Sequence, residues 1–199
     1  DAAQEQARID GWWDALLQGG PETVLATVNQ AFSDNERPSA AVAFDGTEMS
    51  VLVIGPSLDE MPEKRFAETA SGNPTLKAMT KTERNQLHLI AVVGHMIVTL
   101  KEGFAVAPTC DRIRLVMLQR SGAWHDVLVA GLFSREHIIT TDWSSSSSMM
   151  SLDEAEDLRW NPVGRTQELR PLDLYADPDL QALVDIANSA EWVEDEEQG

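Results

Sequence analysis

A chain of 199 residues is long enough to bury one good core, and its 43% of hydrophobic residues argues against global disorder. Its net charge of −18 opposes the phosphate backbone of nucleic acids, so we expect no nucleic-acid partner. The single cysteine, Cys110, excludes an internal disulfide, and no apolar run reaches bilayer-spanning length; we expect a cytoplasmic protein with no membrane partner.

Residues 1–32 have the pattern of a helical hairpin. One apolar stripe recurs at helical spacing: Ile9, Trp12, Trp13, Leu16 and Leu17. Gly19-Gly20 ends this helix, and Pro21 suits the first turn of the next one. So tight a turn predicts two antiparallel helices, and we expect the adjacent tryptophans to pack in the core.

Two β-hairpins are predicted further along the chain. Asp45-Gly46 lies between two β-prone runs, and a type I′ turn favours this pair because both central residues need positive φ. The second hairpin spans 112–133, and its strands are apolar on both faces, which predicts cover on both sides by helices or by another subunit. Residues 137–143 form a candidate fifth strand. Segments 45–55 and 121–131 match at several positions, which either a duplication or two ordinary hairpins explains; we favour ordinary hairpins.

Between the hairpins, residues 80–101 are predicted to form one long helix. Thr80 and Glu83 have the spacing of a capping box at its start. The alternative is a strand followed by a turn at Gly94, because the run is rich in isoleucine and valine. Polar residues at helical spacing predict one narrow edge that faces water, with the rest of the helix buried. This edge comprises Arg84, His88, His95, Thr99 and Glu102.

The C-terminal part is predicted to fold back over the middle of the chain. Ser151 and Glu154 have capping-box spacing for a short helix that ends at Asn161-Pro162, and 163–176 is expected to be extended. Asp177-Pro178 begins a final helix. Segment 141–199 has a net charge of −12 and segment 81–140 of +2, so opposite charge favours the contact. The predicted apolar docking residues are Leu172, Leu174, Leu180, Leu183 and Val184.

Together these elements predict an α+β protein. It has an N-terminal helical hairpin, an antiparallel sheet of about five strands around one long buried helix, and a C-terminal helix. We expect one domain over 1–193, divided into the hairpin (1–32), the sheet and central helix (40–143) and the C-terminal wrap (144–193). An acidic tail follows at 194–199.

The chain carries no motif of a metal or cofactor site. His88 and His95 are seven residues apart, about 10 Å along a helix, so one ion cannot bridge them. No glycine-rich phosphate loop or GxSxG elbow is present. Cys110 is the only thiol, with His125 and His137 as the least poor bases, and we expect it not to be catalytic.

Two functions remain from the sequence. The first is a non-enzymatic, chaperone-like protein-binding module, with self-association as one possibility; element order and acidity are broadly similar to those of small acidic chaperones, and no motif assigns a family. The second is a hydrolase or transferase whose site assembles only in three dimensions. Candidate binding residues are cationic and can also be charge partners within the fold: Arg112, Arg114, Arg120 and Arg135.

Overall fold

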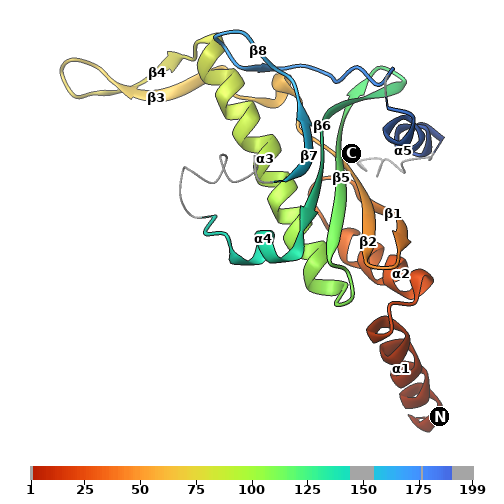
Figure 1. Cartoon of the computed structure of the whole chain (residues 1–199). Coiled ribbons are helices and arrows are strands. Elements are labelled where there is room, and N and C mark those ends of the chain that lie inside the picture. Colours follow the sequence, from red (N-terminus) through yellow and green to blue (C-terminus); the bar gives the residue numbers. More distant parts are fainter. Residues whose placement is uncertain (1, 144–154, 176, 190–199) are drawn as a thin grey trace.

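A computed structural model describes residues 2–143, 155–175 and 177–189 of the chain. Its long central helix, α3 (Lys81–Val106), packs on one face of a five-stranded sheet (Figure 1). The α+β class is therefore confirmed. The strand order is β1 (Ser39–Asp45), β2 (Glu48–Ile54), β5 (Arg112–Ser121), β6 (Trp124–Ser134) and β7 (Glu156–Trp160).

The sheet is mixed rather than wholly antiparallel. Of the four strand pairings in its described part, three are antiparallel, and β2 and β5 run parallel with Val51 opposite Leu115. Parallel neighbours need a crossover that returns the chain to the starting edge, and α3 makes this return. Both predicted hairpins form, and Gly122 has positive φ in the second turn. The predicted Asp45-Gly46 type I′ turn is wrong: Asp45 pairs with Glu48, Gly46 and Thr47 make the turn, and Gly46 has positive φ whereas Asp45 does not. The strand pairing therefore extends one residue further than the Asp-Gly signal indicated.

Helices cover both faces of the sheet. On one face, α2 (Pro21–Phe32), α3 and α4 (Arg135–Thr140) enclose the main core around Val92 and Leu115. On the other face, α5 (Pro178–Ser189) packs Leu180 and Val184 against Val116. The predicted docking of the C-terminal part is thus confirmed, and the strands that are apolar on both faces are covered on both.

The central helix begins as predicted, with a complete capping box. Glu83 N donates to Thr80 Oγ1 at 3.2 Å, and Thr80 N donates to Glu83 Oε2 at 2.7 Å. The predicted water-facing edge is wrong: His88 and Thr99 are buried, and Pro56 O lies 2.8 Å from His88 Nε2. Polar side chains on this edge point inward because loop groups accept or donate hydrogen bonds there.

The exposed side of α3 is apolar instead. Ile90 is 56% exposed and Val98 is 61% exposed, with exposed Gly94 between them at four-residue spacing. We call Ile90, Gly94 and Val98 the α3 stripe. The expectation that no apolar run reaches bilayer-spanning length is wrong. Within the described chain, α3 is the one helix long and apolar enough to cross a bilayer, and half of its most apolar 18-residue window is buried inside the protein. A core helix of a soluble protein has this same composition.

Two elements predicted near the C-terminal end differ in the structure. Residues 135–140 form α4, capped where Ser134 Oγ accepts from His137 N at 3.2 Å, so the predicted strand at 137–143 is wrong. The fifth strand is β7, where a helix was predicted, and Ala130 of β6 pairs with Arg159. Hydrogen bonding to β6 favours a strand here more than the local sequence favours a helix. Ser151 and Glu154 lie outside the described residues.

Shorter elements complete the described chain. The predicted extended segment 163–176 is wrong in its first part. The two-residue strands β8 (Pro162–Val163) and β9 (Glu168–Leu169) pair antiparallel as a small hairpin, with a turn over 164–167. Asp177 caps α5, as predicted, because its Oδ1 accepts from Leu180 N at 3.0 Å. The 3-10 helix η1 (Leu58–Glu60) follows β2.

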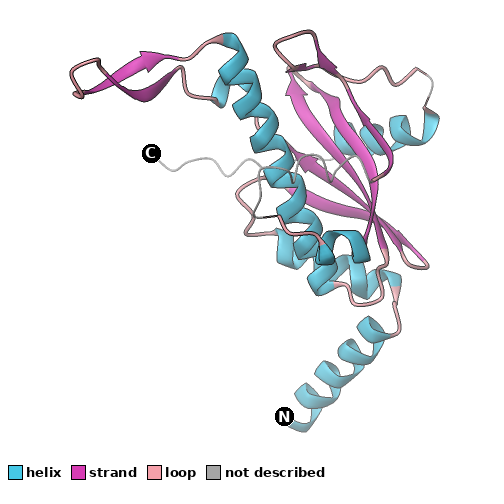
Figure 2. Ribbon diagram, turned by 60° about the vertical axis from the view of Figure 1, so that its left-hand side comes forward, coloured by secondary structure: helices cyan, strands magenta, loops and turns pink. Residues whose placement is uncertain are grey.

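Two elements project from the body. Helix α1 (Ala2–Leu17) leaves α2 at the Gly19-Gly20 turn, and Leu16 is its one buried residue among those described (Figures 1 and 2). The hairpin of β3 (Lys64–Glu68) and β4 (Pro74–Ala78) extends from the N-terminal end of α3. We call this hairpin the arm. Its two ends meet, since Met79 N donates to Glu63 O at 2.8 Å.

Candidate functional site

A cavity of about 490 Å³ lies between α5 and the outer face of the sheet. Side chains alternate along a strand, so Glu48 and Ser50 point to this face while Val51 points into the main core. Leu180 and Leu183 of α5 form an apolar wall. The polar lining residues are Glu48, Ser50, Arg114, Asp157, Arg159, Asp177 and Asp179.

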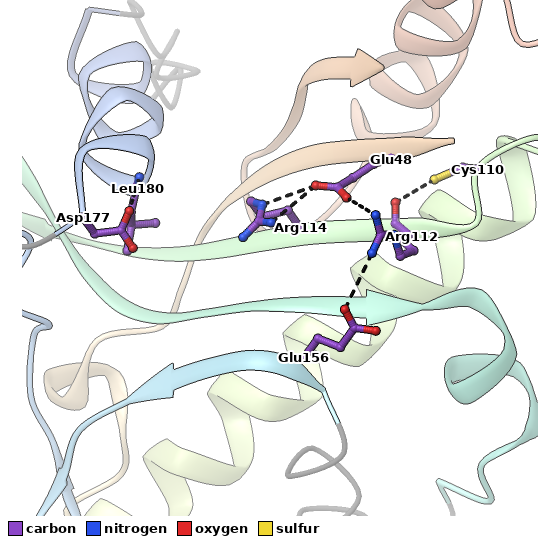
Figure 3. Close-up of polar contacts among 7 residues, drawn as sticks. All are labelled: Glu48, Cys110, Arg112, Arg114, Glu156, Asp177 and Leu180. Carbon is purple, nitrogen blue, oxygen red and sulfur yellow. Dashed lines mark hydrogen bonds and ion pairs between the residues drawn. The ribbon is translucent and has the colours of Figure 1, made fainter. Parts of the chain in front are cut away.

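Ion pairs hold most of these charges in place. The Glu48 carboxylate lies between two arginines, at 3.0 Å from Arg112 Nη2 and 3.5 Å from Arg114 Nε (Figure 3). Arg112 also reaches Glu156 at 3.6 Å, and Arg159 pairs with Asp177. Two of the four arginines predicted for binding are therefore charge partners within the fold.

The other two predicted arginines lie elsewhere. Arg120 is exposed near the end of β5. Arg135 turns inward and donates to three backbone carbonyls at the end of α3: Phe104 O at 2.8 Å, Ala107 O at 2.5 Å and Cys110 O at 2.8 Å. Its guanidinium carbon lies 5.1 Å from the centre of the Phe104 ring. The four arginines do not form one binding site, and Arg135 caps a helix.

A bulge between β6 and β7 shapes the cavity floor. The register shifts between Ala130 and Leu132, and Asp157 on the opposing strand has φ +52°, in the left-handed region. Sequence reasoning placed this carboxylate on a solvated helix face and not in a cavity, because a bulge depends on pairing between distant strands. The alternation of Glu48 and Ser50 with apolar residues was the available signal for a polar patch on the outer face.

The described contacts in the cavity are between carboxylates and arginines. They supply fixed hydrogen-bond donors and acceptors that suit a small polar molecule. Within the part of the chain that is described, no recorded contact in the cavity pairs a nucleophile with a proton acceptor, and no group of three potential metal ligands occurs.

Cys110 lies away from the cavity, in the loop between α3 and β5. It is buried, and its Sγ donates to Arg112 O at 3.2 Å. Burial raises the pKa of the Cys110 thiol to about 11, and the nearby charge of Arg135 offsets only part of that rise. His125 Nδ1 lies 3.0 Å from Asn188 Oδ1, and His137 packs against Trp143. That Cys110 is not catalytic stays a prediction.

The state of Cys110 predicts slow chemical modification. At pH 7.5 the folded protein is expected to react with a thiol reagent at least 100-fold more slowly than the protein in 6 M urea, because the buried thiol stays protonated. Absorbance at 412 nm with Ellman's reagent measures both rates. Equal rates would show that the thiol is accessible and ionised in the native protein.

A second polar contact, between Arg37 and Glu60, fixes the start of β1 against η1. Glu60 Oε1 accepts from Ser57 N at 2.8 Å and from Arg37 Nη1 at 3.2 Å. The hydrogen bond from Arg37 outweighs the effect of partial burial and lowers the pKa of Glu60 to about 2.

Replacing Arg37 with glutamine should therefore raise the pKa of Glu60 by about 1 to 2 units towards its ordinary value, near 4.3. Carbonyl-detected NMR titration of the Glu60 side chain measures it. Because the folded pKa lies below the unfolded one, this carboxylate stabilises the native protein above about pH 4.3, and that contribution is lost as the pH falls towards 2. An unchanged pKa in Arg37→Gln would assign the shift to the Ser57 cap.

A different kind of surface covers α1. Its apolar stripe was predicted to pack in the core, but Trp12 is 40% exposed and Trp13 is 52% exposed, so that prediction is wrong. Their rings stack with centroids 5.3 Å apart and 16° between planes. We call this the tryptophan surface, and its members are Ile9, Trp12, Trp13 and Leu17.

The tryptophan surface borders an open hollow of about 690 Å³ between α1 and α2. Trp12 forms one wall, Ala31 of α2 forms another, and Val106 marks the end of α3. Asp34 adds a carboxylate at the rim. An apolar hollow beside stacked tryptophans is a typical place for an aromatic or aliphatic side chain from a partner.

No protein-family model, curated protein sequence or solved structure matches this chain.

Proposed function

We propose that this chain is a non-enzymatic, cytosolic protein-binding module that holds a protein partner through the tryptophan surface. The observation that supports this most is the stacked pair Trp12 and Trp13, exposed on a helix that projects from the body. Soluble monomers rarely expose contiguous apolar patches, and tryptophan is enriched among the residues that carry binding energy. The buried free thiol of Cys110 suits a reducing compartment.

The form of α1 supports binding of a helix in a groove. The apolar residues recur at helical spacing on one face, as in amphipathic helices that dock into apolar grooves. A helix of 16 residues with one buried side chain has little tertiary packing of its own, and isolated helices of about 12–15 residues are marginally stable in water. A partner would bury the tryptophans and stabilise the helix together.

A hydrolase or transferase has weaker support. The thiol candidate Cys110 is buried with a raised pKa, and the cavity carboxylates Glu48 and Asp177 are held by arginines. These groups suit the stability of the fold and the retention of a polar molecule better than proton transfer.

Site-specific photo-cross-linking tests the proposed function. The photoreactive residue p-benzoylphenylalanine replaces Trp13 in the full chain, and the cells that naturally produce the protein are irradiated. We expect a covalent protein adduct from position 13. As a matched control, the same residue replaces Gln4, which is exposed, lies nine residues from Trp13 and so faces the opposite side of α1, and should give no adduct. Equal yields from both positions, or no adduct from either, would contradict a binding role for this surface.

A further inference from the structure

The two projecting elements carry opposite charge. Helix α1 has three carboxylates, Glu5, Asp10 and Asp14, against Arg8, and Asp34 stands at the rim of the neighbouring hollow. The arm has three cations, Lys64, Arg65 and Lys77, against Glu68. In a chain with net charge −18, the arm is a local basic element. It lies at the opposite end of the molecule from the acidic helix α1 (Figure 1).

One face of the arm is apolar and open to water. Phe66 of β3 pairs with Leu76 of β4, so both side chains lie on the same face, together with Lys64 two residues away. Phe66 is 85% exposed and Leu76 is 58% exposed. A two-stranded hairpin is marginally stable by itself in water, so this arm, like α1, gains stability from a partner.

The positions of the two elements fit a two-fold arrangement. The arm lies at the first turn of α3, and Val106 at the last turn of α3 borders the hollow beside Trp12. In Figure 2 the sheet lies on one side of α3 and the arm projects from the other. A helix of 26 residues is about 39 Å long, so the arm and the hollow are separated by roughly the length of α3.

If two copies place their α3 helices antiparallel, the arm of each copy reaches the hollow of the other. The α3 stripe would then lie between the two contacts, with Gly94 near the crossing, where nothing occupies the space beside its backbone. This arrangement is closed and uses the same contact twice, as two-fold dimers do. It also covers the apolar side chains of Ile90 and Val98, which are exposed in the single chain.

We propose that the partner of the tryptophan surface is a second copy of this chain. Phe66 of one arm occupies the hollow beside Trp12 of the other copy, and Lys64, on the same face of the arm, lies near Asp14 and Asp34. This inference rests on the proposed function, because it names the partner of the same surface. Apolar contact supplies most of the affinity, and the charges favour the arm over a second α1, which would repel.

Sedimentation equilibrium of the full chain gives the first test, with an expected mass twice the 21.9 kDa of one chain. Two variants each remove one side of the contact: Trp12→Ala with Trp13→Ala, and Phe66→Ala with Leu76→Ala. Each should raise the dimer dissociation constant at least tenfold while leaving the melting temperature of the monomer unchanged, because these side chains are exposed. Trp124→Ala, at a distant exposed tryptophan, is the matched control and should dimerise as the native chain does.

Mixing the two variants separates this contact from any other. A heterodimer of the tryptophan and arm variants has one contact with both sides intact, whereas each variant alone has none, so the equimolar mixture should regain dimer. A native chain that remains monomeric at 100 µM would overturn the inference. So would a dimer that depends on the tryptophans and not on the arm, since that result indicates contact between two α1 helices.

The outcomes distinguish this inference from the proposed function. A monomeric native chain whose position 13 still cross-links to a different protein in cells would retain the proposed function and reject the second copy. A cross-linked adduct with twice the mass of the chain, together with recovery in the mixture, supports both.

Discussion

A chain that ends at Trp143 should lose cooperative unfolding or aggregate. The truncation removes β7 and α5, so Leu52, Val116 and Val127 of the outer face become exposed. Burial of a large apolar side chain contributes about 1.5–3 kcal/mol, and both Leu180 and Val184 are lost with α5. Because whole domains are stable by only about 5–15 kcal/mol, the loss is a large part of the total. Thermal unfolding followed by circular dichroism, with gel filtration, measures the effect.

A shorter deletion is the control for this truncation. Removing 194–199 leaves every apolar residue of α5 in place, and its melting temperature should lie within about 2 °C of the native value. If the chain that ends at Trp143 is instead a folded monomer with unchanged melting temperature, the C-terminal part contributes nothing to the core.

Replacing Arg135 with methionine should lower the free energy of unfolding by roughly 3–5 kcal/mol. Hydrogen bonds from a charged donor contribute about 1.5–3 kcal/mol each, and Arg135 donates three to carbonyls at the end of α3. Methionine keeps the packing on Phe104 but removes the arginine donor from Phe104 O and Cys110 O, while Ala107 O still accepts from Cys110 N at 3.0 Å. Urea denaturation should show a lower midpoint with an unchanged slope.

Arg8→Met is a suitable control, because Arg8 makes a fully exposed ion pair with Glu5 and its loss should leave the urea midpoint unchanged. Arg135→Lys keeps the charge but not the planar fork of donors, so we expect an intermediate loss. A change below about 1 kcal/mol in Arg135→Met would mean that water satisfies the carbonyls equally well.

Local signals predicted much of the fold. The capping box of Thr80 and Glu83, the hairpin turn near Gly46 and the cap at Asp177 each depend on a few neighbouring residues, so local sequence was enough to predict them. The turn itself lies one residue later than the predicted Asp45-Gly46 pair. The apolar runs of β5 and β6 likewise predicted a sheet covered on both faces.

Contacts between distant segments were beyond these signals. The helical spacing of apolar residues identified the stripe on α1. It could not show whether this stripe packs against the rest of the same chain, and in the structure Trp13 is exposed. His88 and Thr99 resembled a surface edge because their polar partners come from elsewhere in the chain. The parallel pairing of β2 with β5 and the bulge beside Asp157 depend on which strands meet. The cavity beneath α5 was missed for the same reason.

The closed base of the arm has an evolutionary consequence. Since the backbones of Glu63 and Met79 are hydrogen bonded, a short turn could join them without moving the start of α3. Insertions at such sites are tolerated because they leave the core unchanged. A single insertion or deletion in the gene could therefore add, lengthen or remove the arm. Descendants of one ancestral core could differ in assembly through this single segment, while their sheet and central helix diverge slowly.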